Sequence, residues 1–264
     1  MFRKLFSALI AMAVIISISG CGKGKTSLTL AGSTAFQPFA EKLAEKYMTT
    51  NPNVTITVQG GGSAVGIQSA NSGAAQIGMA DLVTLPEDAK ALTATVVAKD
   101  GVAIVVNPAN KIINLTTDQI RDIFNGKITN WKEVGGENAP ITVVSREAGS
   151  GTRSSFEQIV TNITLKKDAL IQDSNGTIRE TVANDANSIG YLSHGLLNEK
   201  IKALKVDGQD CTVESIVSGN YKLVRPIFLL VKGNLEGEIK NFIDYILSEE
   251  GQNTIKKDGL LPAK

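Results

Sequence analysis

The sequence predicts a mixed α/β protein, and three observations lead to that prediction. Short β-rich runs alternate with segments of helical periodicity from Ser27 onward. Three of these runs end in glycine or hydroxyl residues directly before a helical pattern, a junction at which ligands of open α/β sheets gather. The apolar run from Pro226 to Val231 is typical of a strand buried on both faces.

The first half of the chain is predicted from turn residues and periodicity. Phe39, Leu43 and Tyr47 recur every four residues and form one buried stripe of a helix. The expected order is a strand at 28–30, a helix from Pro38 that ends at Asn51, a strand at 54–58, a helix after Ser63, a strand at 75–80, a helix opened by Pro86, and β-rich runs at 93–98 and 101–106.

The second half continues the same alternation. Thr116 and Gln119 have the spacing of a capping box, which predicts a helix start. The expected order is this helix, which stops at Asn125, a strand at 141–144, a helix around 156–160, strands at 189–191, 203–206 and 226–231, and a last long helix at 235–247.

The N-terminus is predicted to be a processing segment. Arg3 and Lys4 precede an uncharged apolar stretch that is short for a permanent membrane helix, so residues 1–20 are interpreted as a signal peptide. Small residues directly before Cys21 resemble the bacterial lipobox, in which the cysteine is acylated and becomes the mature N-terminus; residues 21–26 would then be a lipid-anchored tether. The alternative is an incidental cysteine after an ordinary cleavage site.

The charge balance excludes some partners. Removal of residues 1–20 takes away Arg3 and Lys4 and no acidic residue, so 25 basic residues face 26 acidic ones. A nearly neutral chain argues against a nucleic-acid partner, which requires a basic face. Any anion site must therefore be local.

The other residues with reactive or distinctive side chains are interpreted as structural. Cys211 is left without a partner cysteine, so no disulfide is expected and a buried apolar role is predicted. His194 is the sole histidine and has no metal-ligand spacing around it, so no metal is expected. Trp131 is expected to pack in the core.

Three strand-to-helix junctions point to anion binding: Gly32-Ser33-Thr34, Gly60 to Ser63, and Gly149 to Thr152. The first N–H groups of a helix are unpaired and the helix dipole adds positive charge, which together favour an anion. Each junction alone is also explained as a flexible turn or a simple N-cap. Arg146 strengthens the third junction because a guanidinium binds two anion oxygens at once, the alternative being a surface salt bridge with Glu147.

The motifs resemble one known family. In order and spacing they are similar to the binding loops of the substrate-binding lipoprotein of the bacterial Pst-type phosphate ABC transporter, which has a type II periplasmic-binding-protein fold. The segments that carry the resemblance are Ala31–Ala35, Gln59–Ser63, Ile77–Asp81 and Ser145–Arg153, with support from Leu115–Gly126, Ile128–Trp131 and Asn187–Tyr191.

The resemblance implies a set of phosphate contacts and no catalytic residue or cofactor. The set is Thr34, the backbone of Ala35, Ser63, Asp81, Arg146, Ser150, Gly151 and Thr152. Two positions depart from patterns seen in some members, which have serine at Ala80 and aspartate at Ala148. The second change removes a partner that would orient Arg146, and Glu147 is the candidate substitute.

Asp81 is predicted to provide selectivity. Phosphate at neutral pH still carries a proton, and an ionised carboxylate accepts a strong hydrogen bond from it. Sulfate has no proton to donate, so it would face Asp81 as a like charge. The alternative for Asp81 is a helix-capping or solvated aspartate.

The resulting prediction is a two-lobed, periplasmic-binding-protein-like (Venus-flytrap) α/β architecture with crossing hinge strands. Residues 27–105 and 226–264 would form lobe 1 and residues 106–225 lobe 2, with phosphate between them. The implied partners are inorganic phosphate, the permease and ATPase of the transporter, and the cell membrane through the lipid anchor, with the protein a monomer on the extracytoplasmic face. Two alternatives remain open: a secreted phosphate-ester hydrolase, and the same fold with sulfate, molybdate or another oxyanion.

Overall fold

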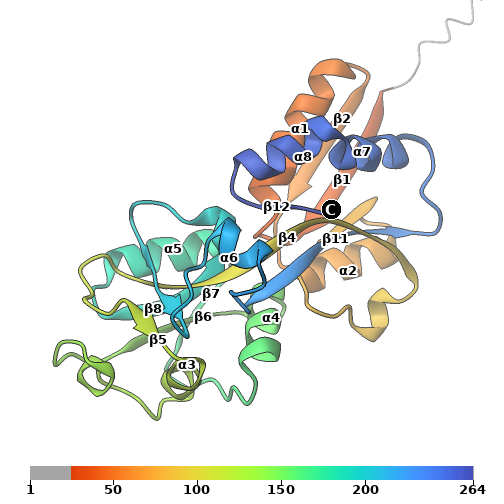
Figure 1. The fold of residues 1–264 in the computed structure, drawn as a ribbon. Coiled ribbons are helices and arrows are strands. Elements are labelled where there is room, and N and C mark those ends of the chain that lie inside the picture. Colours follow the sequence, from red (N-terminus) through yellow and green to blue (C-terminus); the bar gives the residue numbers. More distant parts are fainter. Residues whose placement is uncertain (1–24, 264) are drawn as a thin grey trace, which may run out of the picture.

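The computed structural model describes residues 25–263 and has the predicted α/β alternation (Figure 1). The strands are β1 (Thr26–Gly32), β2 (Val54–Gln59), β3 (Ile77–Ala80), β4 (Leu92–Val106), β5 (Asn114–Leu115), β6 (Thr142–Arg146), β7 (Leu170–Gln172), β8 (Ser188–Ser193), β9 (Lys202–Ala203), β10 (Lys205–Val206), β11 (Val224–Lys232) and β12 (Leu261–Pro262). The helices are α1 (Gln37–Thr50), α2 (Ser63–Ser72), α3 (Thr117–Phe124), α4 (Gly151–Val160), α5 (Asn175–Asn184), α6 (Val213–Val217), α7 (Gly237–Leu247) and α8 (Glu249–Lys257). Short 3-10 helices lie at Glu87–Ala89, Trp131–Val134 and His194–Leu196.

The main sheet runs through two groups of elements. Its strand order is β2-β1-β3-β11-β4-β8-β6-β7, with β1 parallel to β2 and β3, and β6 parallel to β7 and β8. The long antiparallel pair of β4 and β11 connects the two groups, which Figure 1 shows at upper right and lower left. The chain therefore crosses between the groups twice through paired strands.

Two hydrophobic clusters fill the two groups. The first contains Phe39, Leu43 and Phe242, with α1 and α7 packed on the β1–β3 side of the sheet. The second contains Phe124 and Phe156, whose ring centroids lie 4.8 Å apart, with α3 and α4 beside β6 and β8. A third, smaller cluster lies under α2. Each group of elements thus has its own core, as a separately packed unit requires.

Several local predictions are confirmed. The predicted stripe of α1 is buried, and Thr116 accepts a hydrogen bond from the Gln119 backbone in a complete capping box at the start of α3. Trp131 is 2% exposed and Cys211 is buried, as expected of packing residues.

Some predicted elements differ from the structure. The strand expected at 203–206 is two short strands, β9 and β10, because β9 pairs with β4 and β10 with β5. The β-rich runs at 93–98 and 101–106 are one continuous strand, β4, because the carboxylate of Asp100 between them is satisfied by a buried arginine on the opposite strand. The helix expected after Pro86 is only the 3-10 turn at Glu87–Ala89. The long helix expected at 235–247 is confirmed as α7, and a further helix that was not expected, α8, follows it because Ser248 Oγ accepts a hydrogen bond from the Gly251 N–H.

Candidate anion-binding site

Asp81 lies at the carboxyl end of β3, and every polar atom it has is engaged. Its side chain is buried: Oδ1 accepts a hydrogen bond from Ser63 Oγ at 2.8 Å, and Oδ2 accepts one from Thr152 Oγ1 at 3.0 Å. Its N–H donates to Ser63 Oγ at 3.0 Å, and its C=O accepts from Ser155 Oγ at 3.1 Å. The carboxylate is therefore held in one orientation between α2 and α4.

The three predicted junctions meet at this point. The Gly62 N–H donates to Gly32 O at 2.9 Å, and the Ala64 N–H donates to Gly149 O at 3.1 Å. Both bonds require close backbone approach, and Gly62 has φ of 86°, which a residue with a side chain rarely adopts. Segments far apart in the sequence thus converge on one place.

Backbone donors point to an anion at this convergence. The N–H groups of five predicted residues donate to no protein group among the described residues: Thr34, Ala35, Ser63, Gly151 and Thr152. Ser63 begins α2 and Gly151 begins α4, so the dipoles of both helices add positive potential here. This is the donor set that an oxyanion requires.

Arg146 is oriented by Glu147. Arg146 Nε and Nη2 each donate to the Glu147 carboxylate at 2.8 Å, and Nη2 also reaches Asp173 O at 3.3 Å. The side chain of Arg146 is only 1% exposed, so this is not a surface salt bridge. Glu147 thus takes the orienting part that Ala148 cannot. The remaining Nη1 is buried and has no hydrogen-bond partner in residues 25–263, so one edge of the guanidinium is available to a ligand.

Ser150 is the N-cap of α4. Its Oγ accepts a hydrogen bond from the Arg153 N–H at 3.2 Å, which is the simple capping role considered from the sequence. The hydroxyl hydrogen is still free to donate, and Ser150 is buried beside the other predicted residues. Capping and ligand contact are therefore compatible.

A family match follows from comparison with known proteins. The profile of the PBP superfamily domain matches residues 19–250. The phosphate-binding protein PstS of Bacillus subtilis is 37% identical over 251 residues, which cover 93% of this chain and 84% of that protein. The chain belongs to the family of PstS phosphate-binding proteins, within the PBP superfamily.

Solved structures of relatives agree with the fold. A protein from Clostridium perfringens, described as a phosphate ABC transporter substrate-binding protein and solved with bound phosphate, has a TM-score of 0.88 and 40% identity, with 90% of this chain and 100% of that chain covered. An ABC-type phosphate transport receptor from Vibrio cholerae has a TM-score of 0.74 and 36% identity, with 89% of this chain and 99% of that chain covered. The predicted two-lobed fold and the predicted family are both confirmed.

Asn175 belongs to the same cluster, although the sequence analysis missed it. Its Nδ2 donates to Thr34 Oγ1 at 3.0 Å and to Thr152 Oγ1 at 3.3 Å, and its Oδ1 accepts from the Ser193 N–H at 3.0 Å. A signal was present: Asn175 opens α5 directly after β7 and the cap Ser174, so it is a fourth strand-to-helix junction of the kind already recognised.

Arg225 and Asp100 were also missed, and no local signal marks them. Both side chains are fully buried. Arg225 Nη2 donates to Asp100 Oδ2 at 2.8 Å, while Nη1 lies 2.6 Å from Asp81 Oδ2 without the direction of a hydrogen bond, so that contact is an ion pair. Burial raises the pKa of Asp100, and the charge of Arg225 opposes that rise.

His194 has a hydrogen-bonding neighbour within the fold. His194 begins the 3-10 helix at His194–Leu196, and its Nδ1 lies 2.9 Å from Gly259 O. Within residues 25–263 no cluster of three or more His, Cys, Asp or Glu could hold a metal ion. None of the helices that the structure describes is long and apolar enough to cross a membrane.

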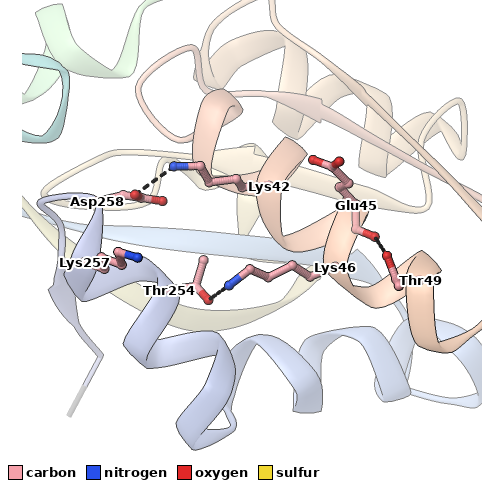
Figure 2. Close-up of a pocket in the computed structure, with 7 residues that line it drawn as sticks. All are labelled: Lys42, Glu45, Lys46, Thr49, Thr254, Lys257 and Asp258. Carbon is pink, nitrogen blue, oxygen red and sulfur yellow. Dashed lines mark hydrogen bonds and ion pairs between the residues drawn. The ribbon is translucent and has the colours of Figure 1, made fainter.

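A surface pocket between α1 and α8 is separate from the cluster around Asp81 (Figure 2). Two of its three lysines have partners: Lys42 Nζ pairs with Asp258 at 2.7 Å, and Lys46 Nζ donates to Thr254 Oγ1 at 2.8 Å. These contacts join α1 to α8 and to the residue that follows it.

Proposed function

We propose that this protein binds inorganic phosphate outside the cytoplasmic membrane and delivers it to the permease of an ABC transporter. The observation that carries the proposal is the convergence of free backbone N–H groups, hydroxyls and one edge of a buried guanidinium beside a buried carboxylate. The names of the related proteins, which bind or transport phosphate, support it. The family is one of transport binding proteins, and we propose no catalysis.

Each predicted contact has a proposed part. The N–H groups of Ala35, Gly151 and Thr152 donate to phosphate oxygens. Hydroxyls of Thr34, Ser63, Ser150 and Thr152 add further donors. Arg146 supplies charge through its unpaired Nη1. Two of these hydroxyls donate to Asp81 here, and a hydroxyl rotates freely to redirect its hydrogen to a ligand.

Asp81 is proposed to accept the phosphate proton. A carboxylate offers about four lone-pair positions. Ser63 Oγ uses one on Oδ1, while Thr152 Oγ1 and Arg225 share Oδ2, so Oδ1 keeps room for one more donor. Sulfate would bring two negative charges together at this atom, and like-charge contacts disfavour binding strongly.

Closure of two lobes is proposed as the signal that the permease reads. We propose lobe 1 at residues 27–105 and 226–264 and lobe 2 at 106–225, crossing in β4 and β11. Contacts such as Thr152 to Asp81 would then join the lobes and stabilise the closed form.

The membrane anchor is proposed from the sequence alone, because residues 1–24 lie outside the described residues. We propose that residues 1–20 are a signal peptide, that Cys21 carries the lipid, and that the protein acts as a monomer on the outer face of the cell membrane. Cys21→Ser should move the protein from the membrane fraction to the medium or periplasm, and retention of the variant in the membrane fraction would contradict the anchor.

Calorimetric titration of the purified protein with phosphate and with sulfate tests the binding proposal. We expect heat of binding with phosphate and none with sulfate at equal concentration. Asp81→Asn should reduce the ratio of the two affinities by about tenfold or more, because the like-charge penalty disappears. An unchanged ratio would refute the part given to Asp81. Turnover of a chromogenic phosphate ester would favour a hydrolase instead.

A further inference from the structure

Arg225 and Asp100 lie where the two long strands cross between the hydrophobic clusters. They are direct partners in the antiparallel register of β11 and β4. On one side, Val102 and Leu223 belong to the second cluster; on the other, Ala98 and Ile227 belong to the first. This charged pair therefore occupies the position at which a closing movement would bend the strands.

One guanidinium joins two buried carboxylates there. Arg225 Nε and Nη2 reach Asp100 Oδ2 at 3.2 and 2.8 Å, and Nη1 lies 2.6 Å from Asp81 Oδ2. Ser193 Oγ donates to the other oxygen of Asp100 at 2.9 Å. The contacts close into a ring of six residues: Asp81, Thr152, Asn175, Ser193, Asp100 and Arg225.

Arg225 is the cation beside the buried carboxylate of Asp81. A carboxylate as buried as Asp81 is costly to ionise unless a cation compensates it. Arg225 on β11 contacts it and is shared with Asp100 on β4, while α2 and α4 present hydroxyls. Arg225 is thus the cation that contacts Asp81 in the part of the chain described.

We propose that Arg225 is a positioning residue for anion selectivity, which keeps Asp81 an ionised hydrogen-bond acceptor. The inference rests on the proposed binding of phosphate. Without the guanidinium, burial drives Asp81 to take up a proton. It then donates a hydrogen bond, which suits a fully deprotonated oxyanion such as sulfate.

Arg225→Met tests this, because methionine fills part of the arginine's volume and carries no charge. Phosphate and sulfate affinities are titrated from pH 6 to 9 in wild type and variant, and the ratios are compared at each pH so that phosphate's own protonation cancels. At pH 7 the variant's selectivity should fall about tenfold or more relative to wild type, and it should recover toward pH 9 as Asp81 ionises. If the role of Arg225 were purely structural, Arg225→Met would weaken the binding of phosphate and of sulfate by the same factor at every pH. Wild-type selectivity in the variant at pH 7, or a loss that does not recover with pH, would overturn the inference.

Two variants serve as controls. Asp100→Asn keeps an oxygen for Arg225 and leaves Arg225 to compensate Asp81, so selectivity should stay within about twofold of wild type. If it falls as far as in Arg225→Met, disruption of the ring explains the result and the inference fails. Should Arg225→Met not fold, judged by circular dichroism, Arg225→Lys decides: retained selectivity with weaker binding supports the proposal, and lost selectivity refutes it. Absence of phosphate binding in the wild-type protein would refute the proposed function itself, a separate result.

Discussion

Gly151→Ala tests whether the close packing around Asp81 is the ligand-binding state. A Cβ at Gly151 would lie 2.1 Å from Ser63 Oγ and 2.7 Å from both Asp81 O and Asp81 Oδ1. The carbonyl oxygen is backbone and Oδ1 is held by Ser63, so these atoms cannot swing away. Gly151 itself does not have a positive φ, so alanine adds no backbone strain. The added methyl conflicts only with groups that come from a different segment.

We expect Gly151→Ala to disfavour the closed form and not to lower the folding stability of the ligand-free protein. Forcing one extra methyl into a packed site costs about 1–3 kcal/mol. Because each 1.4 kcal/mol is tenfold in affinity, phosphate binding should weaken about 5- to 150-fold. The ligand-free protein should keep its unfolding temperature or gain slightly, since alanine favours helix over glycine and the open form has no clash.

Gly176→Ala is the matched control, since it also lies in the first turn of a helix beside the site. A Cβ there meets only Ser174 Oγ at 3.7 Å, an ordinary contact. Titration calorimetry with phosphate gives the affinities, and small-angle scattering with and without phosphate reports compaction. Affinity of Gly151→Ala within twofold of wild type, or an equal loss in Gly176→Ala, would show that the packed arrangement is not the binding state.

Two further predictions concern Arg146 and Cys211. Arg146→Lys should weaken phosphate binding by about 1–3 kcal/mol in calorimetric titration, because one ammonium cannot pair with both oxygens of Glu147 and still present a free edge to a ligand; an unchanged affinity would exclude contact through Nη1. Burial raises the pKa of the Cys211 thiol from 9 to about 12, so the thiol stays protonated at pH 8 and iodoacetamide should label it only after unfolding; rapid labelling of the native protein would contradict the buried placement.

Local patterns in the sequence determined much of the site. The glycine and hydroxyl residues at 32–34, 60–63 and 149–152 identify strand-to-helix junctions, because a helix start has the same backbone requirements in any protein. Glu147 could be named as the partner of Arg146 because the two are neighbours in the chain, and their side chains do pair. The capping box at Thr116 and the stripe of α1 were predictable for the same reason.

Only the tertiary structure determined which residues far apart in the sequence form a buried charged cluster. Asp100 and Arg225 are 125 positions apart, and each is an unremarkable polar residue within a β-rich run until β4 and β11 pair. The strand through Asp100 is continuous because that pairing satisfies a carboxylate whose local sequence resembles a turn. Sequence patterns describe what neighbours along the chain can do, whereas burial and long-range pairing set the cost of each charge. The buried carboxylate of Asp81 therefore has as its ion-pair partner an arginine that no local motif marks.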